Sequence, residues 1–295
     1  MRICITADLH YDIARSRPST ERLAVRACRT GAEGASGDAL VLVGDTAGAA
    51  LEPLREALAL FDTFPGRRLL VPGNHCLWCR PGETSLDRYE RILPEIAAEA
   101  GFAVLDHAPV VVEGVGLVGS IGWYDYSLRD ESLGIPEPFY RAKVAPGAAA
   151  RLDEHRPLVA AHADELTPRH MAIAARWMDG ANVRLGMSDE QFTAMLARKL
   201  AQQLDDLAPR VDHIVAFIHH LPFRELVPAD RPDRFAFAAA FMGAASLGEV
   251  LRAHPKVTHI YCGHSHWHDR QTIDGRTVVN IGSTYTDKRL EVLDL

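Results

Sequence analysis

The chain has 295 residues, of which 47% are hydrophobic and 24% are charged, enough for a sizeable core in one large domain or at most two. Its formal charge of −7 gives no overall field that favours nucleic acid or an anionic membrane, although a local basic patch is compatible with it. The longest apolar stretch, 235–245, is well short of the about 20 residues that a membrane span needs.

The cysteines and the first residues of the chain indicate a compartment. The five cysteines are an odd number, and Cys76 and Cys79 form a lone C-x-x-C, which is a weak signal for zinc or for redox chemistry. The opening sequence, MRICITADLH, enters a strand at once, so we predict no signal peptide. We expect a cytoplasmic protein in a reducing compartment, with no membrane contact. The sequence does not indicate an oligomeric state.

The first third of the chain alternates between strand and helix patterns. The strands are continuous apolar runs, which is typical of strands covered on both faces, and the alternation favours parallel βαβ units. Residues 102–123 then give short strands broken by Pro and Gly, which indicates an antiparallel or mixed continuation. The expected strands before that point are 2–8, 39–45 and 68–75, and the expected helices are 20–33, 51–64 and 85–100.

The middle of the chain changes character at Tyr124. A proline-bearing loop leads into helical sequence up to Pro209, and a capping box of Ser188 and Gln191 opens an amphipathic helix there. We predict that 124–209 is a helical insertion lying over the active site at one end of the sheet, within a single domain spanning 1–295. The later strand patterns are 213–220, 257–264, a hairpin over 270–282 and 290–295.

Polar side chains follow five of the predicted strands. Ligands of open α/β sheets bind beyond the carboxyl ends of the strands, so we expect these side chains to share one edge. Imidazole and oxygen donors together suit zinc, iron, manganese or cobalt. Each motif alone is a common chance pattern, and only the ordered set favours a metal site. The residues are Asp8, His10, Asp45, Asn74, His75, His219, His220, His264 and His266.

The spacing of the last histidines indicates two ions rather than one. Alternate residues of a strand lie about 6.6 Å apart, so His264 and His266 suit a pair of ions about 3.5–4 Å apart. His268 would lie about 13 Å from His264, too far for the same centre. A single zinc needs only three or four ligands, and more donors than that are present. Asp45, in a tight turn after Gly44, is the natural bridging carboxylate.

The ordered motifs resemble the signature of the calcineurin-like metallophosphoesterases. The resemblance covers residues 8–266 and implies an α/β fold, namely a four-layer α-β-β-α sandwich of two mixed sheets that carries the helical insertion. It also implies a dinuclear centre of transition-metal ions, which would be manganese, iron or zinc. The five blocks that carry it are Asp8-x-His10, Gly44-Asp45, Gly73-Asn74-His75, His219 and Gly263-His264-x-His266.

The resemblance implies a role for each residue of these blocks. His75 would be the catalytic residue that stabilises the phosphoryl group or protonates the leaving oxygen, and Asp45 would bridge the two metals. The ligands of the first metal would be Asp8, His10 and His266. The ligands of the second metal would be Asn74, His219 and His264.

Two positions depart from the usual blocks. Gly48 stands where the second block usually has another Asp, and Cys76 stands where the third block usually has an acid. The two departures leave the ligands in place but remove groups that could orient them. The pair His219 and His220 offers two candidates for one ligand. The resemblance favours His219, as does strand alternation, which leaves His220 behind the centre or at the surface.

The resemblance predicts a hydrolase acting on ester bonds. A water or hydroxide bridging the metals would hydrolyse a phosphodiester or phosphomonoester of a small organic molecule or nucleotide. A non-catalytic metal-bound scaffold, a nuclease and a metallopeptidase are the alternatives. The intact ligand blocks argue against a scaffold, the acidic charge disfavours nucleic acid, and no H-E-x-x-H motif is present.

The sequence assigns no residues to substrate binding. Three stretches supply aromatic and Arg side chains that suit a nucleotide or another organic phosphate, and they are equally compatible with ordinary packing. We predict that the insertion shapes substrate choice, through residues such as Tyr124 and Arg184. The stretches are 76–83, 122–127 and 177–186.

Overall fold

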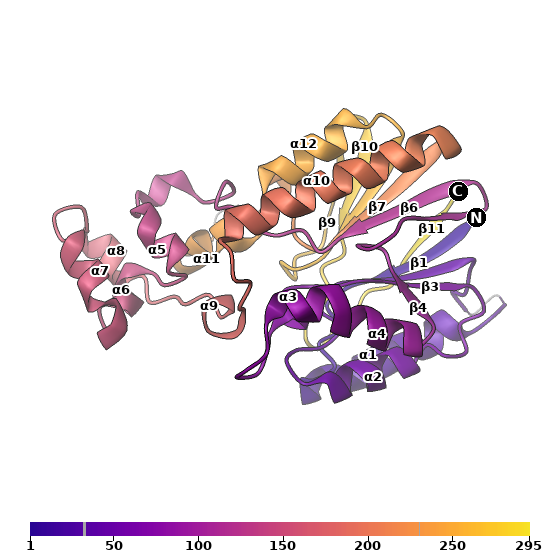
Figure 1. Ribbon diagram of the computed structural model, residues 1–295, viewed down its shortest axis with the longest axis horizontal. Coiled ribbons are helices and arrows are strands. Elements are labelled where there is room, and N and C mark those ends of the chain that lie inside the picture. The colour runs from indigo at the N-terminus through magenta and orange to yellow at the C-terminus, as the bar shows by residue number, and fades with distance from the viewer. Residues whose placement is uncertain (32–33, 230) are drawn as a thin grey trace.

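Two β-sheets packed face to face form the centre of the computed structural model, which describes residues 1–31, 34–229 and 231–295 (Figure 1). The first sheet has the order β11-β1-β2-β3-β4, in which only β11 is antiparallel to its neighbour. Its strands are β1 (Arg2–Thr6), β2 (Ala39–Val43), β3 (Arg67–Val71), β4 (Phe102–Val104) and β11 (Glu291–Asp294).

The second sheet has the order β5-β6-β7-β8-β10-β9 and is also mixed. Its four central strands are parallel, and β5 and β9 pair antiparallel at the two edges. The predicted hairpin is confirmed, since Asp274 and Gly275 have φ of 49° and 77°, as a tight two-residue turn requires. The strands are β5 (Val110–Val112), β6 (Val115–Ser120), β7 (His213–Ile218), β8 (Val257–Cys262), β9 (Asp269–Ile273) and β10 (Arg276–Asn280).

A dry layer of aliphatic and aromatic side chains joins the two sheets. Val41 and Val43 of β2 face Val215 and Phe217 of β7 across it, and all four are fully buried. These residues alternate along their strands, so the intervening residues point to the outer faces, where helices cover them. The continuous apolar runs of the sequence therefore arise because every central strand is buried on both sides.

Helices cover both outer faces, which confirms the four-layer sandwich. In Figure 1, α1, α2 and α4 lie on the first sheet, and α10 and α12 lie on the second. A π-helical turn over Arg88–Ile92 joins α3 to α4, so the predicted helix 85–100 is continuously helical from Ser85 to Glu99. The bounds are α1 (Arg17–Cys28), α2 (Leu51–Ala59), α3 (Ser85–Asp87), α4 (Leu93–Glu99), α10 (Asp189–Leu207), α11 (Asp233–Ala238) and α12 (Ala245–Ala253).

Two predicted helix ends differ from the structure. The helix expected at 51–64 ends at Ala59 and continues as turns, which bring Phe61 and Phe64 into the core. The helix expected at 20–33 runs from Arg17 to Cys28, because Pro18 can occupy the first turn of a helix, and residues 32–33 lie outside the described residues. Among the helices that the structure describes, none combines the length and apolar character that a membrane span needs.

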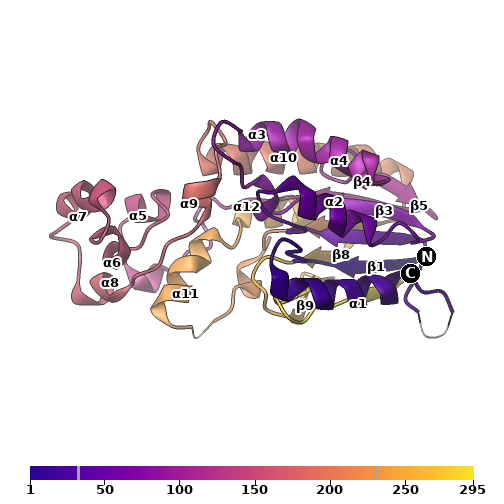
Figure 2. The same cartoon turned by 90° about the horizontal axis from the view of Figure 1, so that it is seen from below.

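The predicted insertion 124–209 divides into two parts. Its first part is a lobe of short helices that projects beyond the sheets (Figures 1 and 2). Its second part is α10, which opens with the predicted capping box of Ser188 and Gln191 and packs against β6 and α12. Because α10 covers the outer face of the second sheet, it is a layer of the sandwich, and the insertion ends near Ser188. The lobe contains α5 (Glu137–Arg141), α6 (Pro146–Ala149), α7 (Arg156–Ala161), α8 (Pro168–Ala172) and α9 (Asp179–Asn182).

Candidate metal centre

The predicted ligands lie in loops that directly follow the strands of both sheets, and backbone hydrogen bonds tie these loops together. The Asp8 nitrogen donates to the Gly44 carbonyl at 3.1 Å, and the Gly263 nitrogen donates to the His219 carbonyl at 3.1 Å. Across the sheets, the His264 nitrogen donates to Asp8 Oδ1 at 3.0 Å. The strand ends of the two sheets therefore meet at one edge, as the sequence predicted.

Left-handed backbone conformations concentrate at this edge. Of the nine described non-glycine residues with positive φ, five are predicted ligands, and their φ values lie between 43° and 70°. Such conformations each cost about 1–3 kcal/mol and persist where the surrounding structure fixes them. They turn the side chains sharply inward as each strand ends. The five residues are Asp8, His10, Asp45, His264 and His266.

The glycines of the motifs leave room for ligands from other segments. A Cβ on Gly44 would lie 1.9 Å from His219 Nδ1, and a Cβ on Gly73 would lie 2.2 Å from Asp45 Oδ1. A Cβ on Gly263 would likewise lie 2.6 Å from the carboxylate of Asp8. Each of these contacts is shorter than any ordinary side-chain contact, so the loops can interlock only with glycine at these positions.

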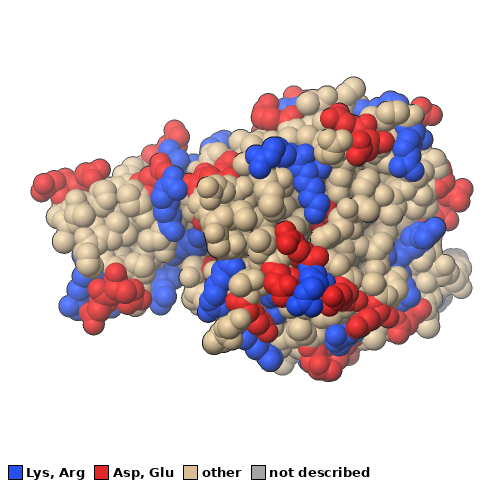
Figure 3. All heavy atoms as spheres, viewed as in Figure 1, with Lys and Arg blue, Asp and Glu red and all other residues tan. Residues whose placement is uncertain are grey.

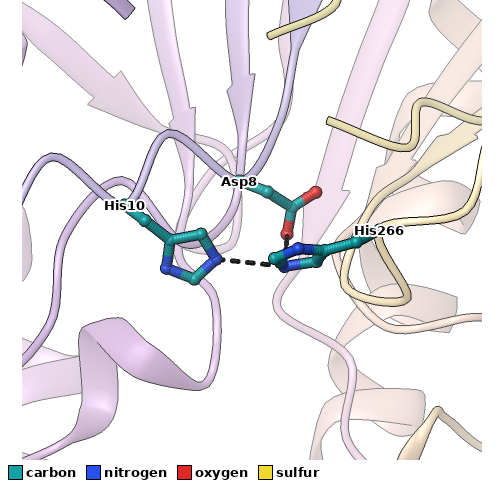
Figure 4. Close-up of side chains that lie close together, drawn as sticks. All are labelled: Asp8, His10 and His266. Carbon is teal, nitrogen blue, oxygen red and sulfur yellow. Dashed lines mark hydrogen bonds and ion pairs between the residues drawn. The ribbon is translucent and has the colours of Figure 1, made fainter. Parts of the chain in front are cut away.

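One group of converging side chains contains Asp8, His10 and His266 (Figure 4). The Nε2 atoms of His10 and His266 lie 3.1 Å apart, and His266 Nε2 lies 3.8 Å from Asp8 Oδ1. Asp8 and His10 follow β1, whereas His266 follows β8, so residues more than 250 positions apart in the sequence meet here. These are the three residues predicted to hold the first metal.

A second group surrounds Asp45, whose Oδ2 lies 3.5 Å from His219 Nε2 and 3.7 Å from His10 Nε2. His219 Nε2 also lies 3.3 Å from Asn74 Oδ1, and His264 offers a ligand atom to the same group. Asp45 therefore lies between the two groups, where a bridging carboxylate is needed.

Hydrogen bonds on the far side of two imidazoles fix which nitrogen faces the centre. His219 Nδ1 donates to the Val43 carbonyl at 3.1 Å, which leaves Nε2 facing Asp45. His264 Nε2 donates to the Phe241 carbonyl at 3.1 Å, which leaves Nδ1 as its free donor atom. Such outer hydrogen bonds set the tautomer and orientation of histidines that bind metals.

Burial also favours the neutral imidazole that a metal requires. It lowers the pKa of His10, His264 and His266, so these rings are neutral near neutral pH. Burial opposes the charge on His219 too, but Asp45 and Asp8 outweigh it and raise the pKa of His219 to about 9. The two carboxylates thus attract a cation, which is a proton on His219 in the absence of metal.

The separations fit metal ions better than direct hydrogen bonding. The carboxylate–imidazole pairs are 3.5–3.9 Å apart, beyond ordinary hydrogen-bond length. Donor atoms that share an ion at bonds of about 2.0–2.2 Å lie about 3–4 Å from one another. The donors that the structure brings together are therefore of the type and spacing that a transition-metal pair needs.

His75 differs from the ligand histidines in its exposure. Its side chain is 19% exposed, whereas that of His10 is fully buried. Its ring stacks on Trp78 at a centroid distance of 3.8 Å, and its Nε2 lies 3.9 Å from Asp45 Oδ2. The location of His75 beside the centre suits a group that contacts substrate, although its proximity to His10 and Asp45 also lets it offer a ligand atom.

His220 and His268 lie outside these groups. His220 is fully buried, so the suggestion that it is a surface residue is wrong, and its ring packs on His264 at 4.2 Å. His268 Nδ1 donates to the Ile281 carbonyl at 3.1 Å.

A buried arginine contacts the backbone at both departures from the usual blocks. The guanidinium of Arg88 donates to the carbonyl oxygens of Gly48, Ala49 and Cys76, at distances from 3.0 to 3.4 Å. The Asp12 carboxylate fills the space beside Gly48, since a Cβ there would lie 2.7 Å from Asp12 Oδ2. The turns that carry Asp45 and His75 are thus held by other residues.

Sequence reasoning missed Asp179 and Lys288. Asp179, the first residue of α9, accepts a hydrogen bond from Asn74 Nδ2 at 2.9 Å. Lys288 Nζ donates to the backbone carbonyls of Asp8 and Thr284, and burial lowers its pKa to about 8. Neither residue belongs to a strand-end motif, and the stretch that contains Asp179 stands out in the sequence only for its aromatic and Arg side chains.

A cavity of about 520 Å³ opens onto the centre, with Asp45, Asn74, His264 and His266 in its wall. The residues expected to shape substrate choice, Tyr124 and Arg184, are absent from this wall. Tyr124 is fully buried, and Arg184 donates to the carbonyl oxygens of Cys79 and Arg80. The insertion reaches the cavity through residues 175–179 instead.

Solved structures share this architecture. Phosphopantetheinyl hydrolase from Mycobacterium tuberculosis superposes with a TM-score of 0.67 at 18% identity, covering 96% of this chain and 89% of that one. A dimetal phosphatase from Danio rerio superposes with a TM-score of 0.52 at 15% identity, covering 99% and 91%. TT1561 from Thermus thermophilus superposes with a TM-score of 0.52 at 12% identity, covering 99% of this chain and 98% of that one.

The chain has the α/β sandwich fold of these solved structures. The predicted resemblance to the calcineurin-like metallophosphoesterases is thereby confirmed for the fold. No family model matches the chain, and no curated protein matches it by sequence. Because the identities are low, the similarity lies in the arrangement of sheets and loops rather than in most of the residues.

The location of Asp45 between the two groups leads to a prediction about metal content. We expect protein purified without chelators to approach two transition-metal ions per chain. Asp45→Asn should lose at least one of them, because it removes the charge shared by both groups. His268→Asn should retain both. Elemental analysis of the desalted proteins measures this, and equal losses in the two variants would show that Asp45 is not the bridge.

Proposed function

We propose that this protein is a metal-dependent hydrolase of phosphate esters of small organic molecules. The observation that supports this most is the convergence of seven predicted ligands from five strand ends, with Asp45 between the other six. The ligands are proposed as Asp8, His10 and His266 for one ion, and Asn74, His219 and His264 for the other.

Two transition-metal ions held there would lower the pKa of a water molecule and stabilise charge on the phosphate. Manganese, iron and zinc all suit the mixed imidazole and oxygen donors. Backbone hydrogen bonds hold the carboxylates in place, because Asp8 accepts one from the His264 nitrogen and Asp45 accepts one from the His75 nitrogen. The charge, position and orientation of the ligands are therefore set before substrate arrives, which lowers the cost of organising them during the reaction.

The proposed role of His75 is to donate a hydrogen bond to the substrate phosphate. Trp78 holds the imidazole by stacking, and the His75 backbone nitrogen donates to Asp45 Oδ1 at 2.9 Å. The ring is thus held beside the centre yet remains partly exposed to the cavity. The acid usual at position 76 is replaced by Cys76, so we favour binding of the phosphoryl oxygens over protonation of the leaving group.

The cavity supports an ester with a flat or apolar organic part and a second negative charge. Trp78, Trp177 and Phe235 contribute aromatic surface to the wall, and Arg176 and Arg234 contribute guanidinium groups. Within the described residues, no ion pair involves Arg176 or Arg234. Aromatic faces stack with planar groups, and guanidinium groups bind phosphate or carboxylate in a bidentate manner.

The alternatives receive less support. A non-catalytic scaffold would not need all seven ligands with their orienting hydrogen bonds. A nuclease would benefit from a basic surface, but the chain carries a charge of −7, and acidic and basic side chains alternate on the face shown in Figure 3. A cytoplasmic location stays a prediction; the five cysteines are free thiols, which is compatible with it.

A substrate screen tests the proposed activity. Protein stripped with chelator and reconstituted with manganese, iron or zinc should hydrolyse at least one phosphate ester, and the stripped protein should not. The panel should contain aryl and nucleoside monoesters, phosphodiesters, a phosphopantetheinyl ester and single-stranded oligonucleotides. Turnover confined to the oligonucleotides would favour a nuclease, and metal binding without any turnover would favour a scaffold.

A second prediction separates the two possible roles of His75. His75→Asn should retain both metals and lower kcat/KM by roughly 10²–10³-fold. The loss should be similar for esters with good and poor leaving groups, because the proposed contact is with the phosphoryl oxygens. A much larger loss for the poor leaving group, with unchanged metal content, would assign His75 to protonation of the leaving oxygen.

A third prediction concerns the guanidinium groups in the cavity. Arg176→Ala should raise KM about 3–10-fold for a nucleoside 3′,5′-bisphosphate, because an exposed charge pair is worth roughly 1 kcal/mol. It should leave KM for the corresponding monophosphate almost unchanged. The matched control is Arg151→Ala, which removes an exposed arginine of the same lobe that lies outside the cavity wall. Equal effects on KM for both substrates would contradict the proposal that Arg176 binds a second negative charge of the substrate.

A further inference from the structure

The lobe of short helices contributes a buried carboxylate next to the centre. Asp179, at the start of α9, is only 1% exposed, and within the described chain no basic side chain forms an ion pair with it. Its oxygens instead accept hydrogen bonds from four different side chains. The donors are Asn74 Nδ2 at 2.9 Å, Trp78 Nε1 at 2.7 Å, Trp177 Nε1 at 2.8 Å and Tyr124 Oη at 3.1 Å.

The bond to Asn74 determines which end of that amide faces the centre. The NH₂ group of Asn74 faces Asp179, whose carboxylate oxygens accept from it. Asn74 Nδ2 lies 2.9 and 3.2 Å from the two carboxylate oxygens. The amide oxygen is then directed to the opposite side, 3.3 Å from His219 Nε2. Because the oxygen is the metal-binding atom of an amide, Asp179 keeps Asn74 in its ligating orientation.

The same carboxylate also fixes the surroundings of His75. Trp78 donates to Asp179 Oδ1, and the ring of Trp78 stacks on His75 at 3.8 Å with an interplanar angle of 23°. The residue after His75 is Cys76, a buried thiol that cannot supply the negative charge usual at that position. Asp179, more than 100 residues away in the sequence, is therefore the carboxylate that contacts both the Asn74 amide and Trp78.

We propose that Asp179 is a positioning residue of the metal centre, through which the lobe orients Asn74 for the second metal ion. This inference rests on the proposed metal ligands. It assigns the lobe a part in building the centre, in addition to forming the wall of the cavity. Asp179 acts through Asn74, so its effect should disappear when Asn74 is removed.

Asp189 is a closely matched control. It is the first residue of α10, only 8% exposed, and it accepts hydrogen bonds from Trp123 Nε1 and the Tyr126 hydroxyl. It also pairs with Lys143. Asp179 and Asp189 are thus both buried aspartates that bind a tryptophan and a tyrosine, but only Asp179 contacts a predicted metal ligand.

The experiment is a calorimetric titration of metal-free protein with Mn²⁺ and with Zn²⁺, combined with elemental analysis and tryptophan fluorescence. Asp179→Asn should weaken binding of the second equivalent by about 10–100-fold and leave the first equivalent unchanged, as expected when a residue that orients a ligand is lost. The fluorescence change on metal binding should shrink with it, because Trp78 and Trp177 donate to Asp179. Asp189→Asn should lower Tm but bind both equivalents as the wild type does.

A double-mutant cycle tests whether Asp179 acts through Asn74. In an Asn74→Ala background, Asp179→Asn should have no further effect on metal affinity. If Asp179→Asn is too unstable to titrate, Tyr124→Phe removes one donor to the carboxylate and should give a smaller loss of the second equivalent. Wild-type affinity in Asp179→Asn, or equal loss in Asp189→Asn, would overturn the proposal.

The outcome is distinct from that of the proposed function. If wild-type protein binds two ions and hydrolyses no ester, the positioning role stands and the activity fails. If wild-type protein does not bind a second ion, the positioning role is overturned, whatever the substrate screen gives.

Discussion

The burial of two carboxylates among imidazoles is the constraint on which the rest of the site depends. Asp8 and Asp45 are almost completely buried, and the imidazoles of His219 and His266 reach them from the loops of the opposite sheet. Isolated carboxylates in such a place would be costly. A pair of metal ions would compensate them, and the sandwich provides the one edge where five strand ends can contribute at once.

The backbone near the centre meets a strict steric requirement. Glycines 44, 73 and 263 leave space that a ligand from another segment fills, and five ligand residues adopt left-handed φ. This conformational cost is borne by a stable framework, in which the sheets share a fully buried apolar layer and helices cover both outer faces. The framework is therefore rigid where the proposed chemistry requires fixed donor atoms.

At the two motif departures, residues distant in the sequence contact the turns of the centre. Arg88 ties down the turns at Gly48 and Cys76, and Asp179 supplies a carboxylate beside Asn74 and Trp78. The segment that contains Asp179 also brings Arg176 and Trp177 to the wall of the cavity. This part of the chain therefore contributes both to the wall of the cavity and to the surroundings of the proposed centre.

The sequence by itself determined the alternation of strands and helices and the strand-end motifs, because strand periodicity and motif spacing are local properties, and it favoured His219 over His220 as the proposed ligand. The tertiary structure decided that α10 is a layer of the sandwich rather than part of the insertion, since an amphipathic helix does not specify the surface that it covers. It also revealed Asp179, Arg88 and the wall of the cavity. Their contacts join segments that are distant in sequence, and no local pattern records such contacts.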